Sequence, residues 1–369
     1  MIPVNEPLLD DVARDNVLSC LEGGWISSEG RFVSEFEQKW AEYCGRAFGV
    51  AVCNGTAALE LAFACLGIEA GDEVILPAFT IISCVLAVLE AGAIPVLVDC
   101  DADTWCMDVD QVAAKITPRT RVIQAVHIYG HPVDMAPLRA LAETHGILIV
   151  EDAAEAHGAH YDGQPIGSFG IASCFSFYAN KIITTGEGGM VLSDDADLAE
   201  RLRAGRNLGF RSDRRFRHTE LSHNYRMTNL QAAVGVAQVH RIEHHVALKR
   251  AMADRYRAGL ASCDQIRLPV ERGNVRNVYW MYGVVLDEDC PFDAVGFADA
   301  LRERQIDTRP FFLGMHEQPV LKELGLFEGE CYPNCEQISR RGLYLPSGLT
   351  VTAAQQQAVV EAVLEVLES

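Results

Sequence analysis

The sequence lacks the features that would tie the protein to a membrane or to nucleic acid. No apolar run reaches the roughly 20 residues that a membrane-spanning helix needs. No charged-then-apolar leader begins the chain, so we expect a cytoplasmic protein. Basic residues are scarce, with 31 Lys and Arg against 51 Asp and Glu. The net charge of −20 disfavours nucleic acid and anionic membranes as partners. A local pocket can oppose that charge, so anionic small ligands are not excluded.

Paired metal-binding motifs are also missing. The 12 cysteines include no Cys-x-x-Cys pair, and no His/Cys pair follows Cys331 and Cys335 to complete a zinc site. We therefore expect buried free thiols in a reducing compartment and no metal. No Gly-x-Gly-x-x-Gly follows the first expected strand, which disfavours a dinucleotide-binding dehydrogenase.

The pattern that is present predicts an α/β fold. The 369 residues are 49% hydrophobic and 22% charged, which is ordinary for a globular protein of two domains. Short apolar runs alternate with helical patterns between residues 48 and 195. The expected strands cover residues 49–53, 73–76, 95–98, 122–127, 147–150, 174–177 and 189–192. The expected helices between them cover residues 56–66, 81–90 and 135–145. This alternation predicts a mostly parallel sheet with helices on both faces and the ligand beyond the carboxyl ends of the strands.

A second, smaller α+β domain is expected after residue 245. Residues 230–261 have helical periodicity and predict one or two long helices. A strand is expected over residues 278–286, and helices over residues 294–304 and 353–367. The predicted domains are therefore residues 1–245 and 246–369.

One lysine and one aspartate carry the chemical signal. Lys181 lies in a mostly uncharged stretch before a glycine-rich turn, where desolvation depresses its pKa and frees the amine for Schiff-base chemistry. Asp152 follows an apolar strand, where a carboxylate needs a partner such as a protonated ring nitrogen. These are the two protein groups that pyridoxal 5'-phosphate (PLP) requires. Taken alone, Lys181 is more typical of a surface lysine than of a catalytic one, and Asp152 is equally typical of a helix cap or a structural ion pair.

A phosphate-binding turn completes the pattern. Gly55 and Thr56 stand between a strand and a helix, where free N–H groups point at an anion. The same turn is also typical of an ordinary helix cap. Ser176 is a second candidate phosphate contact, five residues before Lys181. The order of phosphate turn, aspartate, serine and lysine along one α/β domain predicts a PLP site.

Over nearly its full length the chain resembles the DegT/DnrJ/EryC1/StrS sugar aminotransferases, PLP enzymes with the aspartate-aminotransferase fold (fold type I). The similar segments include residues 24–28, 54–58, 151–158, 176–181, 185–189 and 223–227. The resemblance implies that Lys181 bonds to the cofactor and Asp152 pairs with its ring nitrogen. It also implies a phosphate site made of Gly55, Thr56, Ala57 and Ser176.

The resemblance further implies a homodimer with shared active sites, in which Asn224 reaches the phosphate held by the neighbouring subunit. Glu155 stands where many relatives have a glutamine near the cofactor 3-hydroxyl. A glutamate at this position can form that hydrogen bond only if its protonation state is controlled. Relatives usually place an aromatic residue on the cofactor ring at the position of Ile81. We expect Ile81 to pack on the ring as an aliphatic substitute, with Phe79 as the alternative.

Residues 279–283 and 307–319 are most similar to family members that transfer the amino group of L-glutamate to the C4 ketone of GDP-4-keto-6-deoxy-D-mannose. The alternatives are a UDP- or dTDP-linked keto sugar as substrate, or a PLP-binding regulator without turnover. Surface polysaccharide such as O-antigen lipopolysaccharide is the implied destination of the product. The candidate substrate contacts, each with a structural alternative, are Trp25, His127, Arg211, Arg309 and His316.

Overall fold

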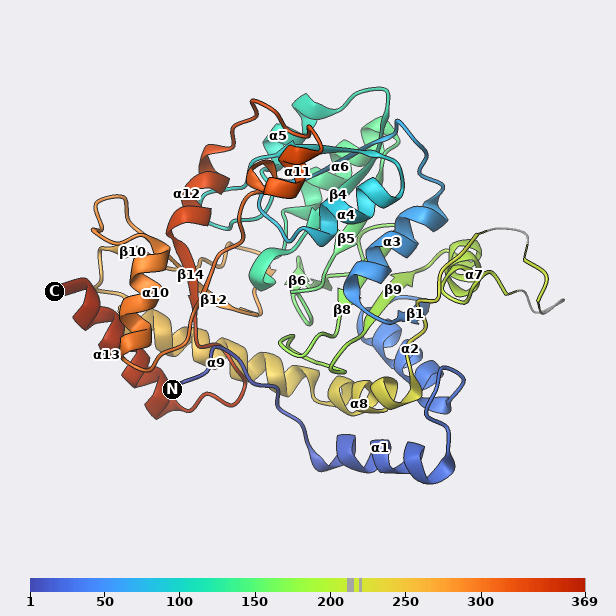
Figure 1. Cartoon of the computed structure of the whole chain (residues 1–369), viewed down its shortest axis with the longest axis horizontal. Helices are drawn as coiled ribbons and strands as arrows, with labels where there is room; N and C mark the ends of the chain where they lie inside the picture. The colour runs from blue at the N-terminus through green and yellow to red at the C-terminus, as the bar shows by residue number, and fades with distance from the viewer. Residues whose placement is uncertain (211–215, 219–220, 369) are drawn as a thin grey trace.

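The computed structural model describes residues 1–210, 216–218 and 221–368, so the predicted substrate contact Arg211 lies outside the described residues. Two bodies of unequal size lie along the longest axis, and the helices α8 (Asn229–His240) and α9 (Ile242–Leu260) run across the base of both (Figure 1). The predicted helical stretch over residues 230–261 is thus confirmed as two helices, which meet at Arg241.

The larger body is built on a seven-stranded sheet. In spatial order its strands are β1 (Phe48–Val52), β9 (Gly189–Ser193), β8 (Ala172–Ser176), β5 (Leu148–Asp152), β4 (Thr120–Val126), β2 (Glu73–Pro77) and β3 (Ile94–Val98). Only β9 runs antiparallel to its neighbours β1 and β8. The other pairings are parallel. The strands read as continuous apolar runs because both faces of the sheet are covered, and the predicted mostly parallel sheet is confirmed.

Helices surround this sheet. Those between the strands are α3 (Gly55–Leu66), α4 (Ser83–Glu90), α5 (Val109–Lys115) and α6 (Met135–His145), followed by α7 (Ala196–Gly205). α3 packs on β8 and β9. Two further helices that the sequence pattern did not reveal, α1 (Asp11–Gly23) and α2 (Arg31–Tyr43), pack against α8.

The smaller body holds a four-stranded antiparallel sheet in the order β10 (Ile266–Arg267), β12 (Tyr282–Leu286), β14 (Gly342–Leu345) and β13 (Arg309–Pro310). α13 (Ala353–Glu368) packs on α9 and α10 (Ala294–Glu303). Along α9 the buried side chains change from the large core, at Val246, to the small core, at Met252. This change supports the predicted boundary near residue 245, which stays a prediction.

Two details depart from the sequence pattern. The strand expected over residues 278–286 begins only at Tyr282, because Tyr279 has a φ of 47° and breaks the extended backbone. The chain start belongs to the small body, since Ile2 bridges to Ile306 and Ser347 donates its N–H to the carbonyl of Val4 at 2.8 Å.

The remaining short elements are β6 (His160–Tyr161), β7 (Gln164–Pro165), β11 (Val275–Arg276), η1 (Ile128–Gly130), η2 (Met315–Glu317), α11 (Pro319–Glu323) and α12 (Pro333–Arg341). Across the described ranges, none of the helices has both the length and the apolar character that crossing a membrane requires.

Candidate active site

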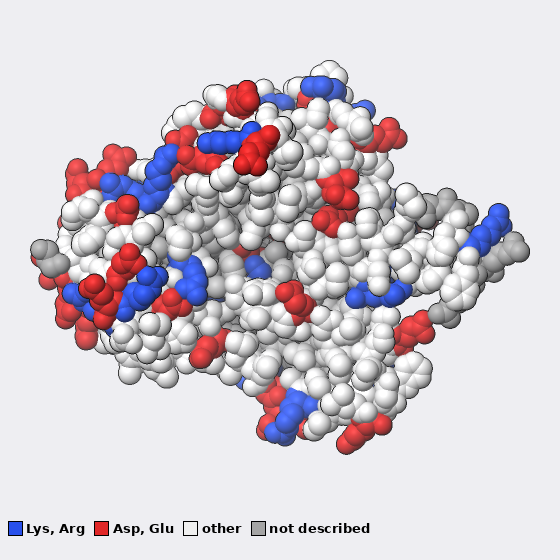
Figure 2. Space-filling view, in the orientation of Figure 1, with Lys and Arg blue, Asp and Glu red and all other residues white. Residues whose placement is uncertain are grey.

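A cavity of about 410 Å³ lies beyond the carboxyl ends of the parallel strands, where this fold class places its ligands. Its walls come from both bodies of the molecule, with Lys181 and Asp152 from the large one and Phe312 and Tyr344 from the C-terminal part of the chain. Charged side chains gather toward the periphery in Figure 2, notably over α10 and α13, and the middle of this face is mostly uncharged. The ionisable groups on the cavity wall include Lys181, Asp152, Glu155 and Glu187.

Lys181 lies in a tight turn after β8, where its N–H donates to the carbonyl of Tyr178 at 2.9 Å. Its side chain is 10% exposed, and its Nζ is 3.6 Å from Oε1 of Glu155. The same Nζ lies 3.8 Å from the ring centroid of Trp280. Burial lowers the pKa of Lys181, and the carboxylate of Glu155 opposes that shift. The amine is therefore easier to deprotonate than a surface lysine, as a nucleophilic lysine requires.

Asp152 is the last residue of β5 and is buried. Its Oδ1 accepts the N–H of Ala154 at 3.1 Å, and its Oδ2 accepts the thiol of Cys84 at 3.1 Å. Among the described residues no lysine, arginine or histidine forms an ion pair with it. A buried carboxylate without a cationic partner suits a ligand that brings its own positive charge, such as a protonated ring nitrogen.

Glu155 links the lysine to the backbone of η1. Its Oε2 accepts the N–H of Tyr129 at 2.8 Å. Burial raises the pKa of Glu155 to about 7, although Lys181 and the Tyr129 N–H act in the opposite direction. A carboxyl with a raised pKa keeps its proton more readily than an exposed glutamate, which favours a hydrogen bond to the cofactor 3-hydroxyl, and this role of Glu155 stays a prediction.

The phosphate turn is closely packed. A Cβ added to Gly55 would lie 2.7 Å from the Cβ of Ser176, so this position requires glycine. The Thr56 hydroxyl lies 2.9 Å from that of Ser83, which also lines the cavity. Gly55 and Thr56 begin α3, where N–H groups lack intrahelical acceptors. These donors fit a phosphate.

Ala57 does not have the predicted role. Its N–H donates to Oδ1 of the helix cap Asn54 at 2.8 Å, and the residue is buried away from the cavity. The prediction of a phosphate contact for Ala57 is corrected, because the cap already uses the donor.

Of the two residues considered for the cofactor ring, Ile81 is the one on the cavity wall. Ile81 lines the cavity and is 42% exposed. Phe79 is fully buried, with its ring centroid 5.7 Å from that of Phe311. Position in the motif therefore decides in favour of Ile81, and its contact with the ring stays a prediction.

Two predicted substrate contacts are core residues instead. His127 is fully buried, accepts the N–H of Val133 at Nδ1 (3.1 Å) and lies 3.3 Å from Oε2 of Glu151 through Nε2. His316 is also buried, with its Nε2 3.2 Å from Oε1 of Glu336. Both predictions are corrected, because neither ring lines the cavity and each has a structural partner.

Arg309 lies at the edge of the small sheet, half-exposed, and pairs with Asp307 at 2.5 Å. It is not on the cavity wall, but its strand partner Tyr344 is. A role for Arg309 with substrate stays a prediction.

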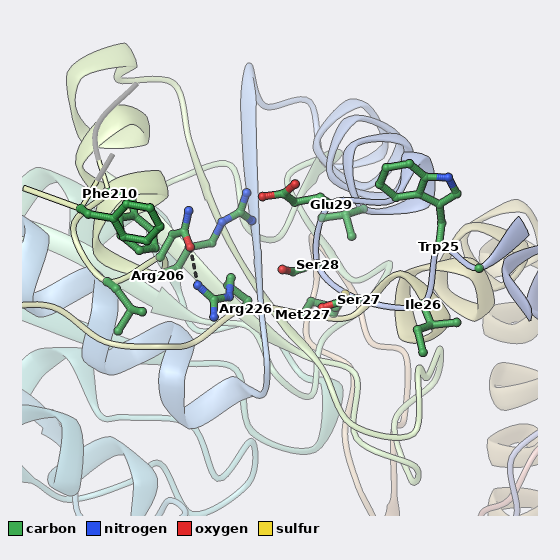
Figure 3. A pocket seen from close by; sticks show the side chains of 14 residues that line it. Trp25, Ile26, Ser27, Ser28, Glu29, Arg206, Phe210, Arg226 and Met227 are labelled. Carbon is green, nitrogen blue, oxygen red and sulfur yellow. Dashed lines mark hydrogen bonds between the residues drawn. The ribbon is translucent and has the colours of Figure 1, made fainter. Parts of the chain in front are cut away.

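Trp25 lies in a different cavity, of about 890 Å³, formed by residues 24–29 and by segments around Arg206 and Arg226 (Figure 3). In this view Glu29 points toward the guanidinium group of Arg206, and Arg226 donates to Oδ1 of Asn207 at 2.5 Å. Trp25 is 63% exposed at the outer edge. Nearby, Asn224 is exposed and bridges to Asn207 without lining the Lys181 cavity of its own chain.

Several cavity residues were absent from the sequence prediction. They are Ser83, Glu187, Trp280, Phe312 and Tyr344. Trp280 belongs to residues 279–283, a segment whose sequence distinguishes subfamilies of the resemblance. No local pattern in that segment distinguishes an aromatic side chain that lines a cavity from one that is buried in the core. The site offers a lysine amine, a buried carboxylate that forms no ion pair among the described residues, and an anion cradle at Gly55, which together fit PLP.

The comparisons with known proteins agree with this geometry. The family model described as the DegT/DnrJ/EryC1/StrS aminotransferase family matches residues 7–364. A curated relative from Caulobacter vibrioides, GDP-perosamine synthase, is 42% identical over 99% of this chain and 98% of its own. GDP-perosamine synthase from Escherichia coli O157:H7 is 38% identical over 99% and 98%. Among solved structures, S. venezuelae DesV in complex with a ketimine intermediate covers 100% of this chain and 99% of its own, at 36% identity and a TM-score of 0.91.

Proposed function

The chain belongs to the DegT/DnrJ/EryC1/StrS aminotransferase family, whose cofactor is PLP, and we propose that it transfers the amino group of L-glutamate to the C4 ketone of GDP-4-keto-6-deoxy-D-mannose. The products are GDP-perosamine and 2-oxoglutarate. The observation that carries the proposal is the meeting of Lys181 and Asp152 in one cavity, in a chain 42% identical to a GDP-perosamine synthase.

The bound cofactor supplies an electron sink that stabilises negative charge at the reacting carbon. Asp152 holds a proton on the ring nitrogen and so keeps that sink strong. Lys181 would hold and move the proton of the reacting carbon, first as a base and then as an acid. Its lowered pKa suits both directions of transfer. Gly55, Thr56 and Ser176 hold the phosphate, and Ile81 packs on the ring.

The assembly that we propose is a homodimer with shared active sites. Asn224 supports it, because the side chain is exposed and lies outside the cavity of its own chain. In the dimer Asn224 reaches the phosphate held by the partner. We also propose a cytoplasmic location and a role in supplying surface polysaccharide, in line with the family resemblance.

The test is a mass-spectrometric assay with PLP, L-glutamate and the GDP-linked keto sugar, run beside the matching UDP- and dTDP-linked sugars. An amino sugar formed only from the GDP substrate is the expected result. A product only from another nucleotide sugar would overturn the substrate and keep the transamination. Bound PLP whose absorbance does not respond to glutamate would overturn transamination itself and favour a binding role.

A further inference from the structure

The thiol of Cys84 contacts Asp152, one of the residues that line the active-site cavity. Cys84 is on the first turn of α4, is fully buried, and its Sγ lies 3.1 Å from Oδ2 of Asp152. The Thr80 hydroxyl lies 3.0 Å from the same sulfur. Thr80 and Asp152 both line the cavity, and Cys84 connects their side chains through its sulfur.

The direction of the hydrogen bonds among these three side chains follows from chemistry. An ionised carboxylate can only accept, so the S–H must donate to Asp152. Burial, and the nearby charge of Asp152, raise the pKa of the Cys84 thiol well above its ordinary value, so the proton stays on sulfur. The Thr80 hydroxyl is then free to donate to the sulfur.

We infer that Cys84 is a positioning residue: its thiol and the Ala154 N–H together fix the Asp152 carboxylate so that it meets the ring nitrogen of the cofactor. The two donors come from different elements, because Ala154 follows β5 and Cys84 begins α4. Each binds a different oxygen, and so together they restrict rotation about the Cβ–Cγ bond. This inference rests on the role proposed for Asp152.

A thiol is a weak donor, and this matters at a carboxylate that must stay basic. A strong donor would withdraw charge from Oδ2, whereas an S–H orients the group and leaves most of its charge for the ring nitrogen. The charged and titratable groups near the same carboxylate are Glu155, Lys181 and Cys174.

The experiment compares Cys84→Ala, Cys84→Val and Cys84→Ser with a matched control, Cys174→Ala. Cys174 is a buried cysteine that pairs with Asp152 across β5 and β8, and the burial and nearby charge of Asp152 raise its thiol pKa. In the described residues its side chain makes no hydrogen bond to Asp152. The control therefore removes a thiol from the same neighbourhood and leaves the proposed contact intact.

Two readouts are independent of the sugar substrate: the Kd of apoenzyme for PLP, and the midpoint of the pH titration of the absorbance of lysine-bound cofactor. Loss of the donor should raise the Kd about three- to tenfold. It should also raise the titration midpoint by about 0.5 pH or more, because a ring nitrogen that loses its proton no longer depresses proton affinity at the lysine nitrogen. Cys84→Ser should restore part of both changes.

The inference is overturned if Cys84→Ala and Cys174→Ala move the midpoint equally, or if Cys84→Ala changes only the melting temperature of the apoenzyme. Cys84→Val preserves more of the side-chain volume and keeps the test decisive if the alanine variant does not fold. Failure of the wild-type protein to bind PLP would instead contradict the proposed function.

Discussion

The indole ring of Trp280 lies against the amine of Lys181, with 3.8 Å between Nζ and the ring centroid. Trp280 is held from two sides: its Nε1 donates to the carbonyl of Asn180 at 2.7 Å, and its own carbonyl accepts from Lys249 at 2.9 Å. The neighbour that stabilises the protonated lysine thus comes from the C-terminal part of the chain.

Replacing Trp280 by leucine should slow turnover. A buried cation–π contact contributes about 0.5–2 kcal/mol, so kcat should fall by roughly twofold to thirtyfold. Trp280→Phe keeps a ring face and should lose less. Steady-state kinetics with saturating glutamate measure the effect, and equal losses in the two variants would show that the ring face is not what matters.

Replacing Lys181 by alanine should abolish turnover. Its proton transfer accounts for a factor of about 10²–10⁴, and no covalent bond to the cofactor can form without the amine. The control is Lys39→Ala, a substitution on α2 where the lysine lies 3.8 Å from Glu35. Formation of 2-oxoglutarate is the measurement, and a normal rate in Lys181→Ala would remove the lysine from the mechanism.

Replacing Glu155 by glutamine should change how apoenzyme stability depends on pH. Burial raises the pKa of the folded-state carboxyl from 4.5 to about 7. Because the folded state binds this proton more tightly than the unfolded state, the proton contributes to the free energy of unfolding. That contribution is complete below pH 4.5 and is lost as the pH rises through about 7. Over that window the glutamine variant should gain unfolding free energy relative to wild type, by at most about 3 kcal/mol.

Urea unfolding of both apoenzymes across this pH range tests the prediction. Glu187→Gln is the control, since Glu187 also lines the cavity but is exposed. A constant difference between wild type and Glu155→Gln would contradict the raised pKa.

Replacing Gly55 by alanine should weaken PLP binding. The added Cβ would meet the Cβ of Ser176 at 2.7 Å and push the phosphate turn outward. Overpacking costs about 1–3 kcal/mol, which corresponds to a Kd about five- to 150-fold higher. The control is Gly23→Ala, where the added atom makes only an ordinary 3.7 Å contact with Trp25. Equilibrium titration of apoenzyme with PLP measures both, and an unchanged Kd in Gly55→Ala would contradict a tight cradle.

The sequence pattern led to the parallel sheet and to Lys181, Asp152, Gly55, Thr56 and Ser176 around one cavity, because the chain order of an α/β fold fixes where its strand ends meet. The prediction from sequence failed at residues whose contacts depend on how separate elements pack together. His127 follows a strand end, as ligand-contacting residues often do, but the fold turns its ring inward to Glu151. Ala57 stands in the phosphate motif, but its N–H serves the helix cap.

By itself, then, the sequence determined the local chemistry: a lysine before a glycine turn, an aspartate after an apolar strand and a capped helix start. Only the tertiary structure decided which distant side chains complete the site. Trp280 lies about a hundred residues after Asn180, whose carbonyl accepts its Nε1–H, and Cys84 lies 68 residues before Asp152. Such contacts depend on how separate elements pack, and packing has no period along the chain from which a sequence could reveal it.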